Sequence, residues 1–123
     1  MKHQITAEEQ RQIVNRYRGL LRDSRNVLSP ESIKLVRKAF NDVASLYKEK
    51  RRISGEPYIL HLVDVARIWV HEMGLSASAI VGALLHETIT DKFLNIIDIE
   101  KRYGSTISQI VQDLTKISSL DPK

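Results

Sequence analysis

Apolar residues recur every three or four positions along most of the chain, and no segment alternates convincingly between apolar and polar residues as a half-buried strand would. The pattern therefore predicts an all-α fold, a helical bundle of about six helices. The first helix is opened by a capping box in the sequence Thr-Ala-Glu-Glu at 6–9 and ends near residues 24–28. Its inner face is predicted to carry Ile13, Tyr17, Leu20 and Leu21.

The second and third helices are separated by a clear break. Ser29 is an N-cap residue, and Pro30 suits the first helical position, where its missing N–H costs nothing. Glycine and proline in the sequence Ser-Gly-Glu-Pro-Tyr at 54–58 then predict a turn, and a third helix is expected from about Leu60 to Met73. The predicted inner faces of the two helices are Ile33, Val36, Phe40, Val43 and Tyr47, then Leu62, Val65, Ile68 and Trp69.

The fourth helix is expected to lie at the centre of the fold. It is predicted to be capped by Ser76 and to run from Ala77 to about Glu87, and residues 79–85 are apolar on nearly every side. A short fifth helix is expected from near Asn95 to Gly104. A sixth is expected to be capped by Ser105, with its inner face formed by Ile107, Ile110, Val111 and Leu114. Residues 118–123 are expected to begin a connection.

Composition narrows the class of protein. A chain of 123 residues has the size of one domain. It has no cysteine, which excludes disulfides and thiolate metal sites, and no apolar run approaches the ~20 residues of a membrane span. The polar N-terminus lacks the apolar stretch of a signal peptide, so a cytoplasmic location is expected.

The net charge of +4 is mild, and few aromatic residues are present to stack on nucleic-acid bases, so no direct nucleic-acid partner is expected. The densest basic cluster is Lys-Glu-Lys-Arg-Arg at 48–52. Such a cluster is either a solvated helix end that the helix dipole favours or an anion site for phosphate. Composition alone leaves both open.

Two of the four histidines lie on or beside strongly apolar helices. These are His61 and His86, whereas His71 lies in a polar patch and is expected on the surface. His86 directly precedes Glu87, and His61 would add a second ring nitrogen from another helix. A set of two histidines and a carboxylate suits manganese, iron or zinc. On these residues alone, hydrogen-bonded core histidines and metal ligands both remain open.

A longer pattern decides in favour of a known family. Residues 52–61 read Arg-Ile-Ser-Gly-Glu-Pro-Tyr-Ile-Leu-His, and residues 80–87 read Ile-Val-Gly-Ala-Leu-Leu-His-Glu, followed by Thr90 and Asp91. Further along, in the same order, come Asp-Ile-Glu at 98–100, Tyr-Gly at 103–104 and Leu-Thr-Lys-Ile at 114–117. The order resembles the N-terminal HD-type hydrolase domain of RelA/SpoT-type proteins, which make and degrade the alarmone (p)ppGpp in the stringent response. The resemblance is strongest over residues 33–117.

The resemblance implies an all-helical domain holding one divalent metal, usually Mn²⁺, that removes the 3′-pyrophosphate from (p)ppGpp. It implies His61, His86 and Glu87 as metal ligands. Arg52 and Ser54 fall in the nucleotide and phosphate pocket, and the acidic pair that serves attack by a metal-bound water falls on Thr90 and Asp91, beside Glu87. The metal would lower the pKa of its water, and a nearby carboxylate would orient or deprotonate that water.

Three departures from the family pattern bear on activity. Glu87 replaces the family's aspartate, and its extra methylene moves the carboxylate by ~1.5 Å where metal–ligand distances vary by only about 0.2 Å. Thr90 replaces a glutamate, and loss of a positioned base typically costs ~10²–10⁴-fold. Leu62 stands where proline is usual, which is expected to change packing only. Mn²⁺ binding is therefore expected to be poorer or lost.

The family's fourth ligand, a distal aspartate, is expected beyond Lys123. Residues 1–123 are therefore interpreted as the N-terminal part of an HD-type domain, incomplete at its C-terminus, in a longer protein with a (p)ppGpp synthetase domain and regulatory domains. Two functions are expected: a weakened or inactive (p)ppGpp 3′-pyrophosphohydrolase, or a pseudo-hydrolase scaffold that controls the adjoining GTP pyrophosphokinase domain. A third possibility is a helical domain with core histidines that binds nothing.

Overall fold

The computed structural model describes residues 5–24, 28–73 and 76–120. The all-α prediction is confirmed: within these ranges the elements are helices, and the one β-type pairing is an isolated bridge between Arg51 and Pro57. The helices are α1 (Ala7–Ser24), α2 (Pro30–Leu46), α3 (Tyr58–Met73), α4 (Ala77–Thr90), α5 (Ile96–Tyr103) and α6 (Ser105–Leu120). None of the described helices is long and apolar enough to cross a bilayer.

The predicted helix starts of α1 and α2 are confirmed by their capping contacts. In α1 the Thr6 Oγ1 atom accepts a hydrogen bond from the Glu9 amide at 3.1 Å, and Glu9 Oε1 accepts one from the Thr6 amide at 3.0 Å. In α2 the Ser29 Oγ atom accepts from the Ser32 amide at 3.1 Å. These contacts satisfy amide donors that the first helical turn leaves without a partner.

Two helices are longer than predicted. α3 begins at Tyr58, two residues before the expected start at Leu60, because Pro57 suits a helix start and the Leu60 amide already bonds to its carbonyl at 3.2 Å. α4 continues to Thr90 and not only to Glu87. Its last turn closes through the bond from the Asp91 amide to the Glu87 carbonyl at 2.8 Å. The acidic residues of the predicted site therefore share one continuous helix end.

Two predictions near the C-terminus are wrong. Ser105 is the first helical residue of α6 and not its cap, because the Ser108 amide bonds to the carbonyl of Gly104 at 3.1 Å. Gly104 adopts φ 93°, a left-handed conformation that glycine allows without strain, and this lets α6 follow α5 directly. Residues 118–120 extend α6 and do not begin a connection, whereas 121–123 lie outside the described residues.

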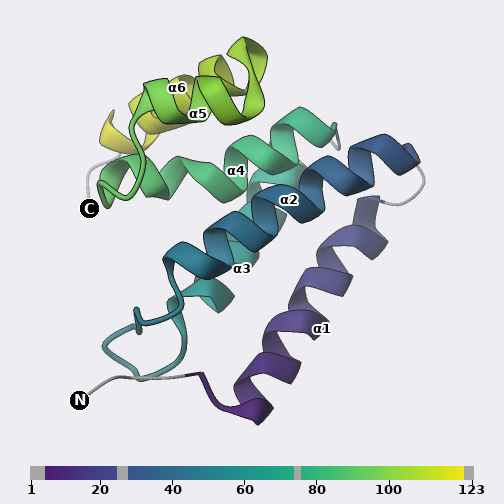
Figure 1. Ribbon diagram of the computed structural model, residues 1–123, viewed down its shortest axis with the longest axis vertical. Coiled ribbons are helices and arrows are strands. Elements are labelled where there is room, and N and C mark those ends of the chain that lie inside the picture. Colours follow the sequence, from purple (N-terminus) through teal and green to yellow (C-terminus); the bar gives the residue numbers. More distant parts are fainter. Residues whose placement is uncertain (1–4, 25–27, 74–75, 121–123) are drawn as a thin grey trace.

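α4 lies at the centre of the fold, as its sequence predicted. It contacts α2, α3 and α6, and Figure 1 shows α2 and α3 on one side of it and α5 and α6 on the other. Every residue from Ala79 to His86 is buried. α6 packs tightly against Gly82, where a Cβ atom would lie 2.5 Å from Ile110 Cγ2. The absence of a side chain at Gly82 therefore sets how closely these two helices pack.

Most of the predicted inner faces are buried. The buried members of these faces are Ile13, Tyr17, Leu20, Val36, Phe40, Val43, Tyr47, Leu62, Ile107, Val111 and Leu114. The half-buried members are Leu21, Ile33, Val65 and Ile110. Ile68 is 62% exposed, so its assignment to the inner face of α3 is wrong. The side chains of Trp69 and His71 lie outside the described residues.

Candidate functional site

The segment between α2 and α3 is a compact loop closed by its own backbone. The Tyr58 amide bonds to the Lys50 carbonyl at 2.9 Å, the Arg52 amide to the Glu56 carbonyl at 3.0 Å, and the Gly55 amide to the Arg52 carbonyl at 2.8 Å. Gly55 adopts φ 104°, which closes the turn at low steric cost. We refer to residues 50–57 as the basic loop. Its fold brings Arg52 and Ser54 to the same edge of the molecule.

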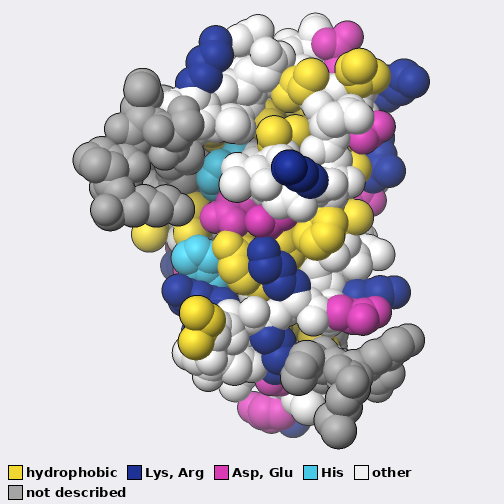
Figure 2. All heavy atoms as spheres, turned by 90° about the vertical axis from the view of Figure 1, so that its left-hand side faces the viewer, with side chains coloured by type: hydrophobic (Ala, Val, Ile, Leu, Met, Phe, Trp, Pro, Cys, Tyr) yellow, Lys and Arg dark blue, Asp and Glu magenta, His cyan; other side chains and the backbone are white. Residues whose placement is uncertain are grey.

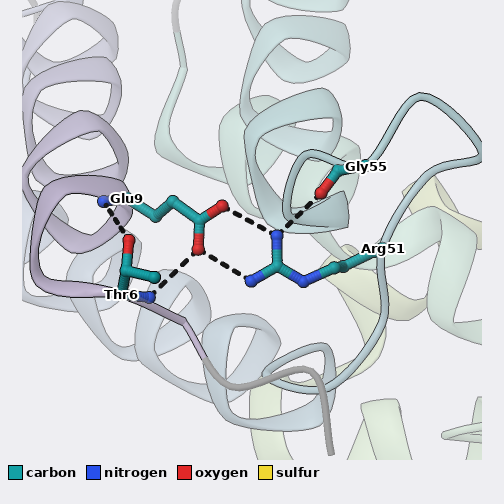
Figure 3. A network of polar contacts seen from close by, with 4 residues as sticks. All are labelled: Thr6, Glu9, Arg51 and Gly55. Atoms are coloured by element: carbon teal, nitrogen blue, oxygen red, sulfur yellow. Dashed lines mark hydrogen bonds and ion pairs between the residues drawn. The ribbon is translucent and has the colours of Figure 1, made fainter.

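Arg51 anchors the basic loop to the start of α1. Its Nη1 and Nη2 atoms each donate to one carboxylate oxygen of Glu9 at 2.7 Å, and Nη1 also donates to the Gly55 carbonyl at 2.7 Å (Figure 3). The hydrogen bond from Arg51 and that from the Thr6 amide hold the pKa of Glu9 down at about 2. This two-pronged pair fixes the position of the Arg51 guanidinium between α1 and the loop.

The basic loop forms one wall of an open cavity of about 630 Å³. The residues that line it are Lys50, Arg51, Arg52, Ile53, Ser54, Tyr58 and His61. The structure thus brings together three of the predicted site residues, namely Arg52, Ser54 and His61. Figure 2 shows this side of the molecule, where histidine, acidic and basic side chains gather on one face. Cationic and hydroxyl groups around an open cavity suit an anionic ligand.

The two carboxylates at the end of α4 are held by tyrosine hydroxyls. Tyr58 donates its hydroxyl to Glu87 Oε2 at 2.6 Å, and the fully buried Tyr47 donates to Asp91 Oδ2 at 2.5 Å. Burial, together with the neighbouring carboxylates, raises the pKa of both tyrosines far above the ordinary value. Both hydroxyls therefore stay protonated and act as donors, and neither carboxylate is among the residues that line the cavity.

The two predicted histidine ligands have different surroundings. His61 is half-buried, and its ring stands edge-on to Tyr58 with centroids 5.3 Å apart. His86 is 5% exposed, and its Nδ1 atom lies 3.0 Å from the Ala83 carbonyl oxygen. A carbonyl oxygen only accepts, so Nδ1 is the donor of this hydrogen bond. His86 therefore has the surroundings of a hydrogen-bonded core histidine, whereas His61 lines the open cavity.

The predicted metal site is not assembled in this arrangement. Over the ranges that the structure describes, no three histidine, aspartate or glutamate side chains lie close enough together to hold an ion. Oε2 of Glu87, one of the three predicted ligands, already accepts a hydrogen bond from the Tyr58 hydroxyl at 2.6 Å. The donors as placed do not fit a divalent ion. Thr90, the last residue of α4, is exposed and does not line the cavity.

Sequence reasoning missed four residues that organise this region: Glu9, Tyr47, Lys50 and Tyr58. The sequence pattern predicts Tyr47 on the inner face of the second helix and Tyr58 in a turn, but it assigns no partner to either hydroxyl. The available signal was chemical: a tyrosine on a buried face needs a partner for its hydroxyl, and carboxylates at a helix end need donors. Which tyrosine meets which carboxylate depends on how α2, α3 and α4 pack.

Comparison with known proteins identifies the family. Residues 39–122 match the HD domain family. The chain is 31% identical over 94 residues to a guanosine-3′,5′-bis(diphosphate) 3′-pyrophosphohydrolase of Aquifex aeolicus and 34% identical over 93 residues to the bifunctional (p)ppGpp synthase/hydrolase SpoT of Escherichia coli, each alignment covering 76% of the chain. It is 37% identical over 94 residues to a putative chloroplastic GTP diphosphokinase of Arabidopsis thaliana, again over 76% of the chain.

The chain spans only 10–13% of the length of these relatives. The family assignment therefore rests on one region of much longer proteins. Within that region both the helical fold and the order of motifs agree with the resemblance found in the sequence. The chain belongs to the HD domain family, and its relatives are of the RelA/SpoT type.

Proposed function

We propose that this domain takes part in (p)ppGpp metabolism, and that it binds the guanosine nucleotide in the cavity beside the basic loop while its own 3′-pyrophosphohydrolase activity is weak or lost. The observation that carries the proposal is the convergence of Arg52, Ser54 and His61 on one cavity in a relative of (p)ppGpp enzymes. We place the protein in the cytoplasm as part of the same proposal.

The binding part rests on charge and donors. Lys50 and Arg52 offer cationic groups at the cavity, and the Ser54 hydroxyl lies beside them. Arg52 and Ser54 now contact the same oxygen of Glu56, at 3.4 and 3.1 Å. These are exposed contacts of small energy, so a pyrophosphate with more charge can replace the Glu56 carboxylate at little cost.

The weakness of hydrolysis follows from the state of the carboxylates. Glu87 and Asp91 each accept a hydrogen bond from a tyrosine, and Asp91 also lies 3.2 Å from the Lys50 ammonium. A carboxylate engaged in this way is a poorer base toward a water, and Thr90 offers only a neutral hydroxyl. Both losses act on the attack step and not on nucleotide binding.

HD-domain hydrolases of this type use a divalent metal, and Mn²⁺ is the ion we propose to test. Bound metal would supply an activated water and would screen the charge on the pyrophosphate. Under this proposal the ligands are His61, His86 and Glu87, which the structure does not bring together, so we derive no catalytic step through the ion.

A second function is favoured by the length of the relatives. Because this region is 10–13% of proteins that include GTP diphosphokinases, the domain can serve as a pseudo-hydrolase scaffold that controls an adjoining synthetase domain. In that role it would bind nucleotide and signal occupancy without turning it over. The partners implied are the C-terminal synthetase and regulatory domains of such a longer protein.

Calorimetric titration of the chain with ppGpp, paired with an assay of 3′-pyrophosphate release in added Mn²⁺, tests both functions. We expect binding that weakens at least tenfold in Arg52→Gln and is unchanged in Arg16→Gln, whose side chain pairs with Asp64 on the exposed side of α1. Hydrolysis is expected to be ~10²–10⁴-fold below that of an intact site. Absence of ppGpp binding would overturn the binding proposal, and rapid pyrophosphate release would overturn the weak-hydrolase proposal.

The pair of altered residues can be tested by restoring the family pattern. In a chain that includes the remainder of the hydrolase domain, Glu87→Asp with Thr90→Glu is expected to raise pyrophosphate release by at least tenfold. The single change Thr90→Glu serves as the control, because it restores the acid without shortening Glu87. No gain in the double variant would show that something beyond these two side chains limits the reaction.

A further inference from the structure

The Lys50 ammonium lies beside the carboxylate of Asp91, at the end of α4, and beside two tyrosine rings. Its Nζ atom lies 3.2 Å from Asp91 Oδ2, 4.2 Å from the centroid of the Tyr58 ring and 5.6 Å from that of Tyr47. The ammonium therefore faces a carboxylate and two aromatic rings at once. Electrostatic attraction to the carboxylate and to the ring faces acts in the same direction.

The two tyrosines form one layer under this ammonium. Their rings are stacked with centroids 5.4 Å apart and an interplanar angle of 13°, and Phe93 closes the other side of Tyr47 edge-on at 4.8 Å. Each hydroxyl of the layer points to a different acid, Tyr47 to Asp91 and Tyr58 to Glu87. The acids are four residues apart on α4 and so lie on the same face.

The cluster of Lys50, Tyr47, Tyr58, Glu87 and Asp91 therefore joins four segments: the end of α2, the basic loop, the start of α3 and the end of α4. The lysine offsets one of the two negative charges, that of Asp91, and the tyrosines donate hydrogen bonds to both carboxylates. We call this group the Lys50 cluster. Its side chains are half-buried or buried, so their contacts are less screened than those of an exposed pair.

We propose that the Lys50 ammonium is the resident cation of this pocket, and that the Lys50 cluster keeps Glu87 and Asp91 in a metal-independent arrangement. In this arrangement an ion that binds Glu87 through Oε2 must displace the Tyr58 hydroxyl, and an ion beside Asp91 must approach the Lys50 ammonium, which has the same sign. Both contacts oppose metal binding. Lys50 and Tyr58 are therefore the residues that exclude the ion.

Thermal melting of the full chain with and without about 1 mM Mn²⁺, together with Mn²⁺ paramagnetic resonance to count free ion, tests the proposal. We expect no Mn²⁺-dependent change in the melting temperature of the wild type. Lys50→Met combined with Tyr58→Phe keeps the aliphatic stem and the ring but removes the charge and the hydroxyl. This variant should melt lower without metal and gain about 5 °C when Mn²⁺ is added at roughly ten times its Kd.

Lys48→Met is the matched control, since Lys48 is an exposed lysine of the same segment outside the Lys50 cluster. It should behave as the wild type. The single variants Lys50→Met and Tyr58→Phe keep the test decisive if the double variant does not fold, and each should bind Mn²⁺ at least threefold more tightly than the wild type. Equal Mn²⁺ affinity in wild type and variants, including no binding in any of them, overturns the proposal. Because Mn²⁺ alone is the probe, the result is independent of whether the cavity takes (p)ppGpp.

Discussion

The two ends of α4 are stabilised in different ways. From Ala79 to Leu85 the helix is apolar and fully enclosed, and its packing against α6 depends on the shape of single residues such as Gly82. From Glu87 to Asp91 the same helix is held by tyrosine hydroxyls and a lysine. The enclosed part loses stability when side-chain volume changes, whereas the polar end depends on directed hydrogen bonds and charge. The predicted catalytic residues Glu87, Thr90 and Asp91 all lie at the polar end.

The largest effect is expected at the apolar end, from Gly82→Ala. The new Cβ atom would lie 2.5 Å from Ile110 Cγ2, so α6 must move, and we expect a loss of about 2–3 kcal/mol in unfolding free energy measured with urea. Gly19→Ala in α1 is the control. There the Cβ meets the flexible end of Arg67 at 3.3 Å, and better helix propensity should give a gain of up to about 1 kcal/mol.

The cause of the Gly82 effect can be isolated with Ile110→Leu, because leucine lacks the β-branched methyl that the new Cβ would meet. The double variant should recover at least half of the stability lost in Gly82→Ala. If the stability losses of the two single changes simply add in the double variant, the clash is not with this methyl. The sensitivity of the apolar end of α4 to side-chain volume would then be smaller than its packing indicates.

The next effect is expected from Tyr47→Phe at the polar end. The change keeps a fully buried ring but removes the donor to Asp91, and we expect a loss of about 1–2 kcal/mol in unfolding free energy. The loss should be smaller than that of Gly82→Ala because Lys50 still neutralises Asp91. A Tyr47→Phe variant as stable as the wild type would contradict a stabilising role of the hydroxyl bond.

A pH-dependent effect is expected from the pair of Glu9 and Arg51. The pKa of Glu9 is about 2 in the folded chain against an ordinary value of 4.5, so the carboxylate stabilises the fold above pH 4.5 and this contribution is lost as pH falls toward 2. Urea midpoints of wild type and Glu9→Gln should therefore differ at pH 6 and converge near pH 2. A difference that stays constant across this range would show that Glu9 acts through packing alone.

The smallest effect is expected at the exposed pair of Arg16 and Asp64. Their side chains are 45% and 47% exposed, so Asp64→Asn should change the unfolding free energy by less than about 1 kcal/mol, and 0.5 M salt should remove the difference. A larger loss would mean that the contact between α1 and α3 depends on this pair. Circular dichroism melting curves at two salt concentrations measure it.

Much of the fold could be read from the sequence because helix periodicity and capping are local. Thr6, Ser29 and Ser76 cap helices as predicted, and the apolar run at 79–85 placed α4 at the centre. Errors arose where local signals are weak. Glu87 and Thr90 carry no apolar pattern, yet the last turn of α4 continues through them, and Ile68 is apolar but exposed.

The site divides in the same way. The motif at 52–61 predicted Arg52, Ser54 and His61 as site residues, and all three line the cavity beside the basic loop. The predicted metal set of His61, His86 and Glu87 does not assemble in the described residues. Whether these three side chains meet depends on where α3 and α4 cross and on which neighbours hydrogen-bond to each carboxylate. The spacing of residues along one helix determines neither of these.

The sequence by itself determined the helices, their buried faces and the membership in a (p)ppGpp-related HD family, because these depend on periodicity and on motifs a few residues long. Only the tertiary structure decided what the acids at the end of α4 contact. Tyr47 directly follows α2, Lys50 lies in the basic loop and Tyr58 begins α3, and they meet Glu87 and Asp91 about 29 to 44 positions away in the chain. Hydrogen bonds act over about 3 Å, so they are decided by packing and not by order along the chain.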